Sequence, residues 1–219
     1  MNRLHDDSVM AANSSVILIR LPAVSSIANR TVRRMITIVQ EEAGHRDAVR
    51  KLTVAAFAHS EFGHNGEADL IDAVRAECTD ILSLVALNHD QVVGHALFSA
   101  ATIQCGSIIH AGMGLAPMAV HPAFQKQGIG STLVTDGMKR LAKRNLAFAI
   151  VAGHAQFYPR FGFFPAAESS VRHGFDGMPQ DIFFLHTTQP QTQFTEGLAY
   201  YHAVFGEQHC GMSKNTDPR

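Results

Sequence analysis

A strand, a glycine turn, a helix and a second strand follow one another in the middle of the chain, and this order constrains the fold more than any other feature. Residues 115–120 (LAPMAV) are apolar, and the polar turn that follows them ends in Gly128 and Gly130. An amphipathic helix is expected next, ending near Asn145. Residues 148–153 (FAIVAG) are a continuous apolar run, typical of a strand buried on both faces. The sequence therefore predicts a βαβ unit with parallel strands.

Two details of this unit bear on what it does. Pro117 lies inside the first strand, where its missing N–H predicts a bulge or a place where the strand parts from its neighbour. The predicted helix turns an apolar stripe toward the core and gathers basic residues near its C-terminus, where cations suit the helix dipole. The stripe consists of Ile129, Leu133, Val134, Met138 and Leu141, and the basic residues are Lys139, Arg140, Lys143 and Arg144.

The glycine turn has the properties of an anion site. Gly128 and Gly130 have no Cβ, so the backbone N–H groups from Lys126 to Ser131 can turn toward a ligand and approach phosphate oxygens. A helix that begins directly after such a turn adds a favourable dipole. On spacing alone, the same two glycines also fit a turn that merely joins a strand to a helix. The turn is therefore either a phosphate-binding site or a connection between a strand and a helix without a binding role.

The remaining pattern predicts a mixed α/β domain whose sheet is mostly antiparallel, with flanking helices. The expected strands are residues 36–40, 82–87, 91–103 and 197–208, and the expected helices are residues 41–57 and 67–77. Residues 82–87 and 91–103 are predicted to form a hairpin around Asn88, His89 and Asp90. The final strand is expected to pair either within the fold or across a homodimer.

Composition limits the class of protein. A chain of 219 residues suits one domain, expected at residues 35–206, with a flexible extension at 1–34 and a disordered tail at 207–219. The 18 basic residues nearly balance the 19 acidic ones, which argues against recruitment by nucleic acid or by an anionic membrane surface. The apolar runs are too short to span a bilayer.

Cysteine and histidine usage points to a cytoplasmic protein without a required metal. Cys78, Cys105 and Cys210 are far apart and form no CxxC spacing, which argues against a disulfide framework and fits a reducing cytoplasm. The chain has 13 histidines but no HExxH motif and no Cys/His pairing at zinc spacing. We therefore expect no metal cofactor.

Two motifs read together resemble the GNAT superfamily of acyl-CoA-dependent N-acetyltransferases. Its Q/R-x-x-G-x-G/A signature matches residues 125–130 (QKQGIG), and its Y-x-x-x-G-F element matches residues 158–163 (YPRFGF). The combination of APMAVHPAFQKQGIG and GHAQFYPRFGF looks most like the YhbS-like branch. The resemblance runs from about Met35 to Phe205 and implies a GNAT fold with acetyl-CoA as cosubstrate.

The resemblance also implies site residues. The backbone of Met118, Ala119 and Val120 would pair with the pantetheine arm in a gap where this strand splays from residues 148–153. Gln125 would open the turn, and the amides of Lys126, Gln127, Gly128, Ile129, Gly130 and Ser131 would hold the pyrophosphate. Tyr158 would be the general acid, a phenol near its ordinary pKa of about 10 that returns a proton to the departing thiolate.

Acetyl transfer to an amine by direct attack needs a neutral amine and no nucleophilic side chain. Neither Cys78 nor Cys105 sits in a Cys/His signature, which argues against a covalent acetyl-enzyme. Candidates for the general base lie in or beside the loop that borders the acceptor cleft in this family, and His154 follows the second strand of the βαβ unit. The loop candidates are Glu61, Glu67, His59 and His64.

The sequence thus predicts an N-acetyltransferase that uses acetyl-CoA and an amine of a small molecule or protein. A catalytically idle acyl-CoA-binding or sensing module is the alternative, because it would keep the turn without a competent acceptor site. A nucleotide binder of P-loop or Rossmann type fits poorly, since the chain has no GK[ST] and no GxGxxG after its first strand.

Overall fold

The computed structural model describes residues 36–58, 66–175, 178–189 and 192–206. The expected extension at 1–34, the tail at 207–219 and the loop residues His59, Glu61 and His64 lie outside these ranges. Within the described residues the strands are β1 Ile36–Gln40, β2 Ile81–Asn88, β3 Gln91–Cys105, β4 Ile108–Val120, β5 Phe148–Ala152, β6 Phe164–Pro165, β7 Val171–His173, β8 Phe183–Thr187 and β9 Gly197–Tyr201. The helices are α1 Arg46–Phe57, α2 Glu67–Glu77 and α3 Ile129–Leu141, with short 3-10 turns between the strands.

The described strands form one mixed sheet in the order β1-β2-β3-β4-β5-β8-β6, and β9 lies beside β3 and β7. The β4–β5 and β7–β9 pairs are parallel and the other pairs are antiparallel. The βαβ unit and the mostly antiparallel sheet predicted from the sequence are therefore confirmed. Since β9 pairs with β3 and β7 of the same chain, its pairing needs no second copy.

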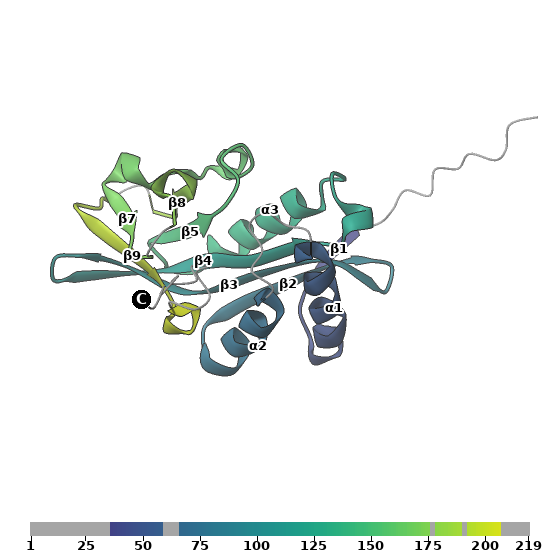
Figure 1. Cartoon of the computed structure of the whole chain (residues 1–219). Coiled ribbons are helices and arrows are strands. Elements are labelled where there is room, and N and C mark those ends of the chain that lie inside the picture. Colours follow the sequence, from purple (N-terminus) through teal and green to yellow (C-terminus); the bar gives the residue numbers. More distant parts are fainter. Residues whose placement is uncertain (1–35, 59–65, 176–177, 190–191, 207–219) are drawn as a thin grey trace, which may run out of the picture. The chain divides into compact units, whose positions relative to one another are not determined.

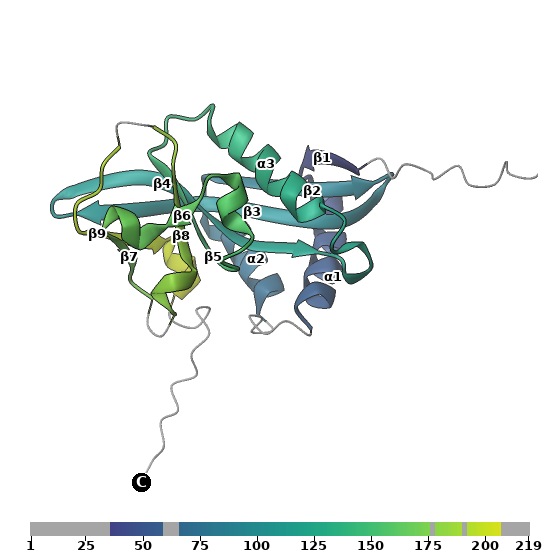
Figure 2. The ribbon, with the colours of Figure 1, turned by 90° about the horizontal axis from the view of Figure 1, so that it is seen from above.

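Helices cover both faces of the sheet: α3 lies on one face and α1 and α2 lie on the other (Figure 1). Seen from above, α3 lies across the strands β1 to β4 (Figure 2). Strand residues alternate between these faces, so Met113 and Leu115 of β4 pack with Leu133 and Val134 of α3. On the opposite face, Leu97 of β3 packs with residues of α1 and α2. In the described part of the chain, no helix is long and apolar enough to cross a membrane.

Several element boundaries differ from expectation. The first helix begins at Arg46 rather than Glu41, because the Glu41 N–H pairs with the Ser83 carbonyl and its side chain enters the sheet interior. The helix α3 ends at Leu141 rather than near Asn145, because Ala147 must pair with the Ala111 carbonyl to align β5 with β4. The final strand, β9, ends at Tyr201 and a 3-10 turn follows at Ala203–Phe205, where a strand over 197–208 was expected. The largest difference is in β4.

β4 begins at Ile108, whereas the sequence predicted a strand only from 115. Its first half carries Gly112 and Gly114, which weaken a strand prediction. Both positions require glycine because residues distant in the sequence pack against them. An added Cβ would lie 2.5 Å from Phe148 at Gly112 and 2.2 Å from Tyr201 at Gly114. Aromatic rings from β5 and β9 thus occupy the space of the missing side chains.

Candidate functional site

β4 and β5 separate part-way along their length. Their pairing runs from Gly112–Phe148 to Leu115–Val151 and stops there. Beyond this point β4 pairs with β3 alone, and the register between them shifts by one residue opposite Leu97. The shift falls at Ala116 and Pro117, so the expected bulge and the parting of the two strands are both present. The edge of β4 that faces β5 is therefore open from Ala116 onward.

The glycine turn leads from this open edge into α3. Gly128 has φ +84° and Lys126 has φ +59°, so the backbone is left-handed at both positions. The first amides of a helix have no intrahelical acceptor, and here they belong to Ile129, Gly130 and Ser131. Amides at such a position can act as donors to an anion.

Two glutamine side chains brace the turn. The Gln125 side-chain amide donates to the Val120 carbonyl at 3.1 Å, which ties the turn to the end of β4. The Gln127 amide donates to the Ala123 carbonyl, also at 3.1 Å. Gln125 also lines the cleft, whereas Gln127 lies outside the cleft lining.

The two glycines of the motif serve different purposes. Gly128 is required by its positive φ, and an added Cβ there would meet nothing within 4 Å. At Gly130, which has ordinary helical backbone, an added Cβ would stand 3.5 Å from Phe157 and 3.8 Å from Met118 and Val120. The protein would tolerate this Cβ, but it would project among residues that line the cleft. Gly130 therefore keeps the cleft open.

One cleft of about 480 Å³ joins the open edge of β4 to the turn. It brings together eight of the ten predicted cofactor-binding residues, and three residues that were not predicted add to it. The predicted residues are Met118, Val120, Gln125, Lys126, Gly128, Ile129, Gly130 and Ser131, and the additions are Phe124, Phe157 and Arg160. Ala119, which was predicted to contribute only its backbone, is not part of the lining. Ala119 faces away from the cleft, beside His95 on β3.

Arg160 is the notable addition. Its guanidinium lies 4.8 Å from the centre of the Phe157 ring and 5.5 Å from that of Phe161, and its Nε donates to the Phe157 carbonyl. Cation–π contacts of this kind hold the charge at the rim of the cleft near Lys126. The signal was present in the sequence, because Arg160 lies inside the YPRFGF motif.

Tyr158 is the buried first residue of the 3-10 turn Tyr158–Phe161 and packs in the core under α3. Its ring packs edge-on against Phe157 and Phe163, at centroid distances of 5.0 Å and 5.9 Å. An added Cβ at Gly153 would lie 2.7 Å from the ring and 3.4 Å from the hydroxyl oxygen. Burial raises the pKa of the phenol well above its ordinary value of 10, which corrects the expectation of an unperturbed pKa. The hydroxyl is therefore a neutral donor throughout the physiological range.

The base candidates are not gathered in one place. His154 is exposed in the turn that follows β5, while Glu67 is the half-buried first residue of α2 on the other face of the sheet. Glu61 lies outside the described residues. Across the ranges the structure describes, no three His, Cys, Asp or Glu side chains lie close enough to hold a metal ion.

A buried polar network occupies the α1–α2 face, away from the cleft. The Glu41 carboxylate accepts hydrogen bonds from Arg75 and Ser83, and the Ser83 hydroxyl lies 2.9 Å from His95 Nε2. Burial alone would raise the pKa of Glu41, but hydrogen bonds involving His95 and Ser83, together with the charges of His95 and Arg75, hold it at about 2. Sequence reasoning missed this network because its members come from four separate elements.

Comparison with known proteins agrees with this geometry. A family model described as an acetyltransferase (GNAT) domain matches residues 80–165, which include β3, β4, the turn, α3 and β5. The uncharacterized N-acetyltransferase YjhQ of Escherichia coli K12 is 37% identical over 111 residues, which are 48% of this chain and 60% of YjhQ. The chain thus aligns with less than two thirds of that relative's length.

YhbS and a Brucella protein match over a larger share of their lengths. The uncharacterized N-acetyltransferase YhbS of E. coli K12 is 29% identical over 69% of this chain and 90% of YhbS. The crystal structure of YhbS in complex with CoA has a TM-score of 0.66 at 26% identity, over 78% of this chain and 91% of that one. A GNAT family acetyltransferase from Brucella melitensis in complex with acetyl-CoA has a TM-score of 0.64 at 29% identity, over 78% and 99%. Residues 80–165 of this chain thus match the GNAT acetyltransferase domain, and the fold is similar to that of YhbS.

Proposed function

We propose that this protein is an N-acetyltransferase that moves an acetyl group from acetyl-CoA to an amine by direct attack. The observation that carries the proposal is the single cleft in which the anion site at the start of α3 continues into the open edge of β4. The family supports it, as do the relatives from E. coli and B. melitensis whose structures contain CoA and acetyl-CoA.

The residues of the cleft fit a pyrophosphate. Backbone amides at 126–131 provide donors at a helix N-terminus, and the absence of a Cβ at Gly130 leaves room for phosphate oxygens to approach them. Lys126 and Arg160 add positive charge at the rim. We propose that these groups hold the pyrophosphate and that the backbone of Met118, Ala119 and Val120 pairs with the pantetheine arm.

We expect the reactive end of the coenzyme to lie where β4 and β5 separate, since the cleft continues from the turn to this point. Bound acetyl-CoA supplies a thioester whose carbonyl is open to attack by a neutral amine. An N–H of the open β4 edge can polarise that carbonyl. The Tyr158 hydroxyl, beside Gly153 at the end of β5, can donate a hydrogen bond to the sulfur as it leaves. Because burial raises the pKa of Tyr158, we propose that its hydroxyl stabilises the thiolate by hydrogen bonding. Another group removes the proton from the amine.

We keep Glu61, Glu67 and His154 as candidates for removing that proton. We also propose that residues 35–206 form the catalytic domain between the segments 1–34 and 207–219, and that the protein works in the cytoplasm. Two buried cysteines, Cys78 and Cys105, carry free thiols, which suits a reducing compartment.

Calorimetric titration with acetyl-CoA, followed by an amine screen that detects released CoA, tests the function. We expect saturable binding and amine-dependent release of CoA. Absence of saturable binding would refute the proposal, while binding without release in a broad screen would indicate a sensing module.

Replacing Tyr158 by phenylalanine is expected to lower kcat about 10-fold, roughly the worth of one hydrogen bond, with acetyl-CoA affinity unchanged. Since the pKa of Tyr158 is raised, the phenol stays protonated, so kcat of the wild type should not fall near pH 10 through its ionisation. Steady-state rates from pH 7 to 10.5 and calorimetry check both points. Unchanged kcat in the variant would contradict the role.

A further inference from the structure

A histidine followed three residues later by a phenylalanine occurs directly after two of the strands. His121 and Phe124 follow β4, and His202 and Phe205 follow β9. The two histidines have nearly the same backbone conformation, with φ/ψ of −52°/133° and −54°/148°, and a 3-10 turn begins at the next residue in both cases. The chain therefore builds the same local unit twice, and the unit after β4 leads into the glycine turn.

His121 accepts most of the hydrogen bonds that the turn Pro122–Phe124 can donate. Proline has no N–H. The Ala123 N–H donates to His121 Nδ1 at 3.2 Å, and the Phe124 N–H donates to the His121 carbonyl at 2.8 Å. The His121 N–H in turn donates to the Val93 carbonyl of β3 at 3.0 Å. One residue thus caps the turn and anchors it to the sheet.

The imidazole of His121 contributes a ring as well as an acceptor. N-cap positions are usually occupied by Ser, Thr, Asp or Asn, whose side chains are short. The His121 ring also packs edge-on against Phe124, with the ring centres 5.7 Å apart. Phe124 lines the cleft. The same side chain therefore caps the turn and contacts the residue that the turn presents to the cleft.

The glycine turn is attached to the capped turn by further hydrogen bonds. The Gln125 N–H donates to the Pro122 carbonyl at 3.3 Å, and the Gln127 side-chain amide donates to the Ala123 carbonyl at 3.1 Å. Both acceptors belong to the capped turn Pro122–Phe124. The direction in which the glycine turn leaves β4 therefore depends on the conformation of the capped turn.

We propose that His121 is a positioning residue for the coenzyme, because its cap orders the turn so that Phe124 and the glycine turn are in place before acetyl-CoA binds. This inference rests on the proposed acetyltransferase function. Ordering a binding segment in the free protein removes an entropic cost that would otherwise weaken binding. Loss of the cap should therefore appear as a weaker affinity for acetyl-CoA.

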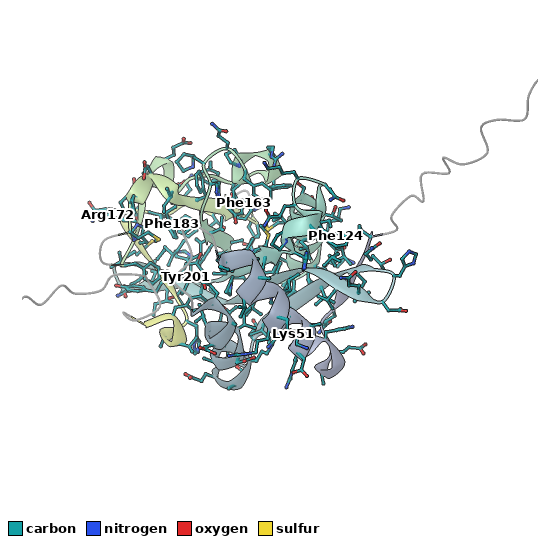
Figure 3. All side chains as sticks on the ribbon, turned by 45° about the vertical axis from the view of Figure 1, so that its right-hand side comes forward. Lys51, Phe124, Phe163, Arg172, Phe183 and Tyr201 are labelled. Carbon is teal, nitrogen blue, oxygen red and sulfur yellow. The ribbon has the colours of Figure 1, made fainter. Side chains whose placement is uncertain are left out.

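The unit after β9 supplies a matched control. The Val204 N–H donates to His202 Nδ1 at 3.3 Å, and the Phe205 N–H donates to the His202 carbonyl at 2.9 Å. Phe205 is buried in the core beneath α1 and α2 and does not line the cleft. In Figure 3, Tyr201, which precedes His202, lies well apart from Phe124. Loss of the His202 cap thus removes the same kind of hydrogen bond away from the cleft.

Calorimetric titration with acetyl-CoA compares three variants of His121 with the wild type. His121→Ala removes the acceptor and the ring and should weaken binding about 10-fold, the size expected for loss of one N-cap hydrogen bond. His121→Asn should bind within about 3-fold of the wild type, because asparagine is a good N-cap and its Oδ1 is as many bonds from Cα as histidine Nδ1. His121→Phe keeps a ring without an acceptor and should resemble His121→Ala.

His202→Ala should lower the urea midpoint of unfolding and leave the affinity for acetyl-CoA within about 2-fold of the wild type. Three results would each overturn the inference while leaving the function standing. These are wild-type affinity in His121→Ala or His121→Phe, no recovery of affinity in His121→Asn, and an equal loss of affinity in His202→Ala and His121→Ala. Failure of the wild type to bind acetyl-CoA would refute the function, and the inference would fall with it.

Discussion

Gly130→Ala is expected to weaken acetyl-CoA binding by about 10- to 100-fold while leaving the protein at least as stable as the wild type. The added Cβ would lie 3.5 Å or more from the nearest protein atoms, so the fold can accept it. It would occupy the space through which phosphate oxygens reach the first amides of α3. Loss of one charge-assisted hydrogen bond costs about 1.5–3 kcal/mol, which is the origin of the expected range.

Stability should move the other way, because alanine is favoured over glycine in a helix by up to about 1 kcal/mol. Calorimetry with acetyl-CoA and urea unfolding measure the two effects separately. Gly44→Ala is the matched control: an added Cβ there meets nothing within 4 Å, and we expect acetyl-CoA affinity to stay unchanged. Wild-type affinity in Gly130→Ala would mean that this glycine does not border the coenzyme.

Glu41→Gln is expected to lower the free energy of unfolding by about 3 kcal/mol at pH 7. The carboxylate is buried and bonded to Arg75 and Ser83, and Arg75 also pairs with Asp72. A pKa held at about 2, against 4.5 for an ordinary glutamate, corresponds to about 3 kcal/mol of preference for the charged form in the folded state. Glutamine would also leave Arg75 buried without its main counter-charge.

The pH dependence follows from the sign of this shift. The folded-state pKa is lowered, so the stabilisation is present above about pH 4.5 and is lost as the pH falls toward 2. Urea unfolding of the wild type from pH 7 to 2.5 should show this loss, and the difference between wild type and Glu41→Gln should shrink across the same window. His95, whose pKa burial lowers, faces the same carboxylate and is present in both proteins.

Asp136→Asn provides the control for a surface pair. Asp136 bonds Arg140 one turn away on α3 at 2.6 Å, and both side chains are partly exposed. Pairs of this kind contribute about 0.5 kcal/mol or less, so we expect a change within that range. A cost for Glu41→Gln no larger than for Asp136→Asn would contradict the assigned role of the buried network.

The parts of the fold and site that could be predicted are those built from neighbouring residues. The turn at Gly128 and Gly130, α3 and β5 follow one another along 25 residues of chain, so periodicity and turn chemistry determine them locally. Pro117 likewise indicated the separation of β4 from β5 through its own missing donor.

What could not be predicted depends on contacts between distant segments. The first half of β4 was missed because Gly112 and Gly114 make room for rings of β5 and β9, which no local pattern reveals. Glu41 was assigned to a helix because its partners Arg75 and Ser83 lie more than 30 residues away. The raised pKa of Tyr158 is a property of its burial among other aromatic rings, and so lies outside a motif match.

The parting of β4 from β5 also creates an edge strand in the interior of a sheet rather than at its rim. Exposed edges invite pairing with other chains, and proteins commonly protect them with proline, bulges or covering segments. Here Pro117 and the bulge lie at the start of the open edge, and the cleft encloses the rest, so a long foreign strand cannot align along it. A short linear molecule with amide groups can. Recognition through main-chain atoms, as proposed for this edge, would depend on the spacing of amides along the ligand and not on its side groups.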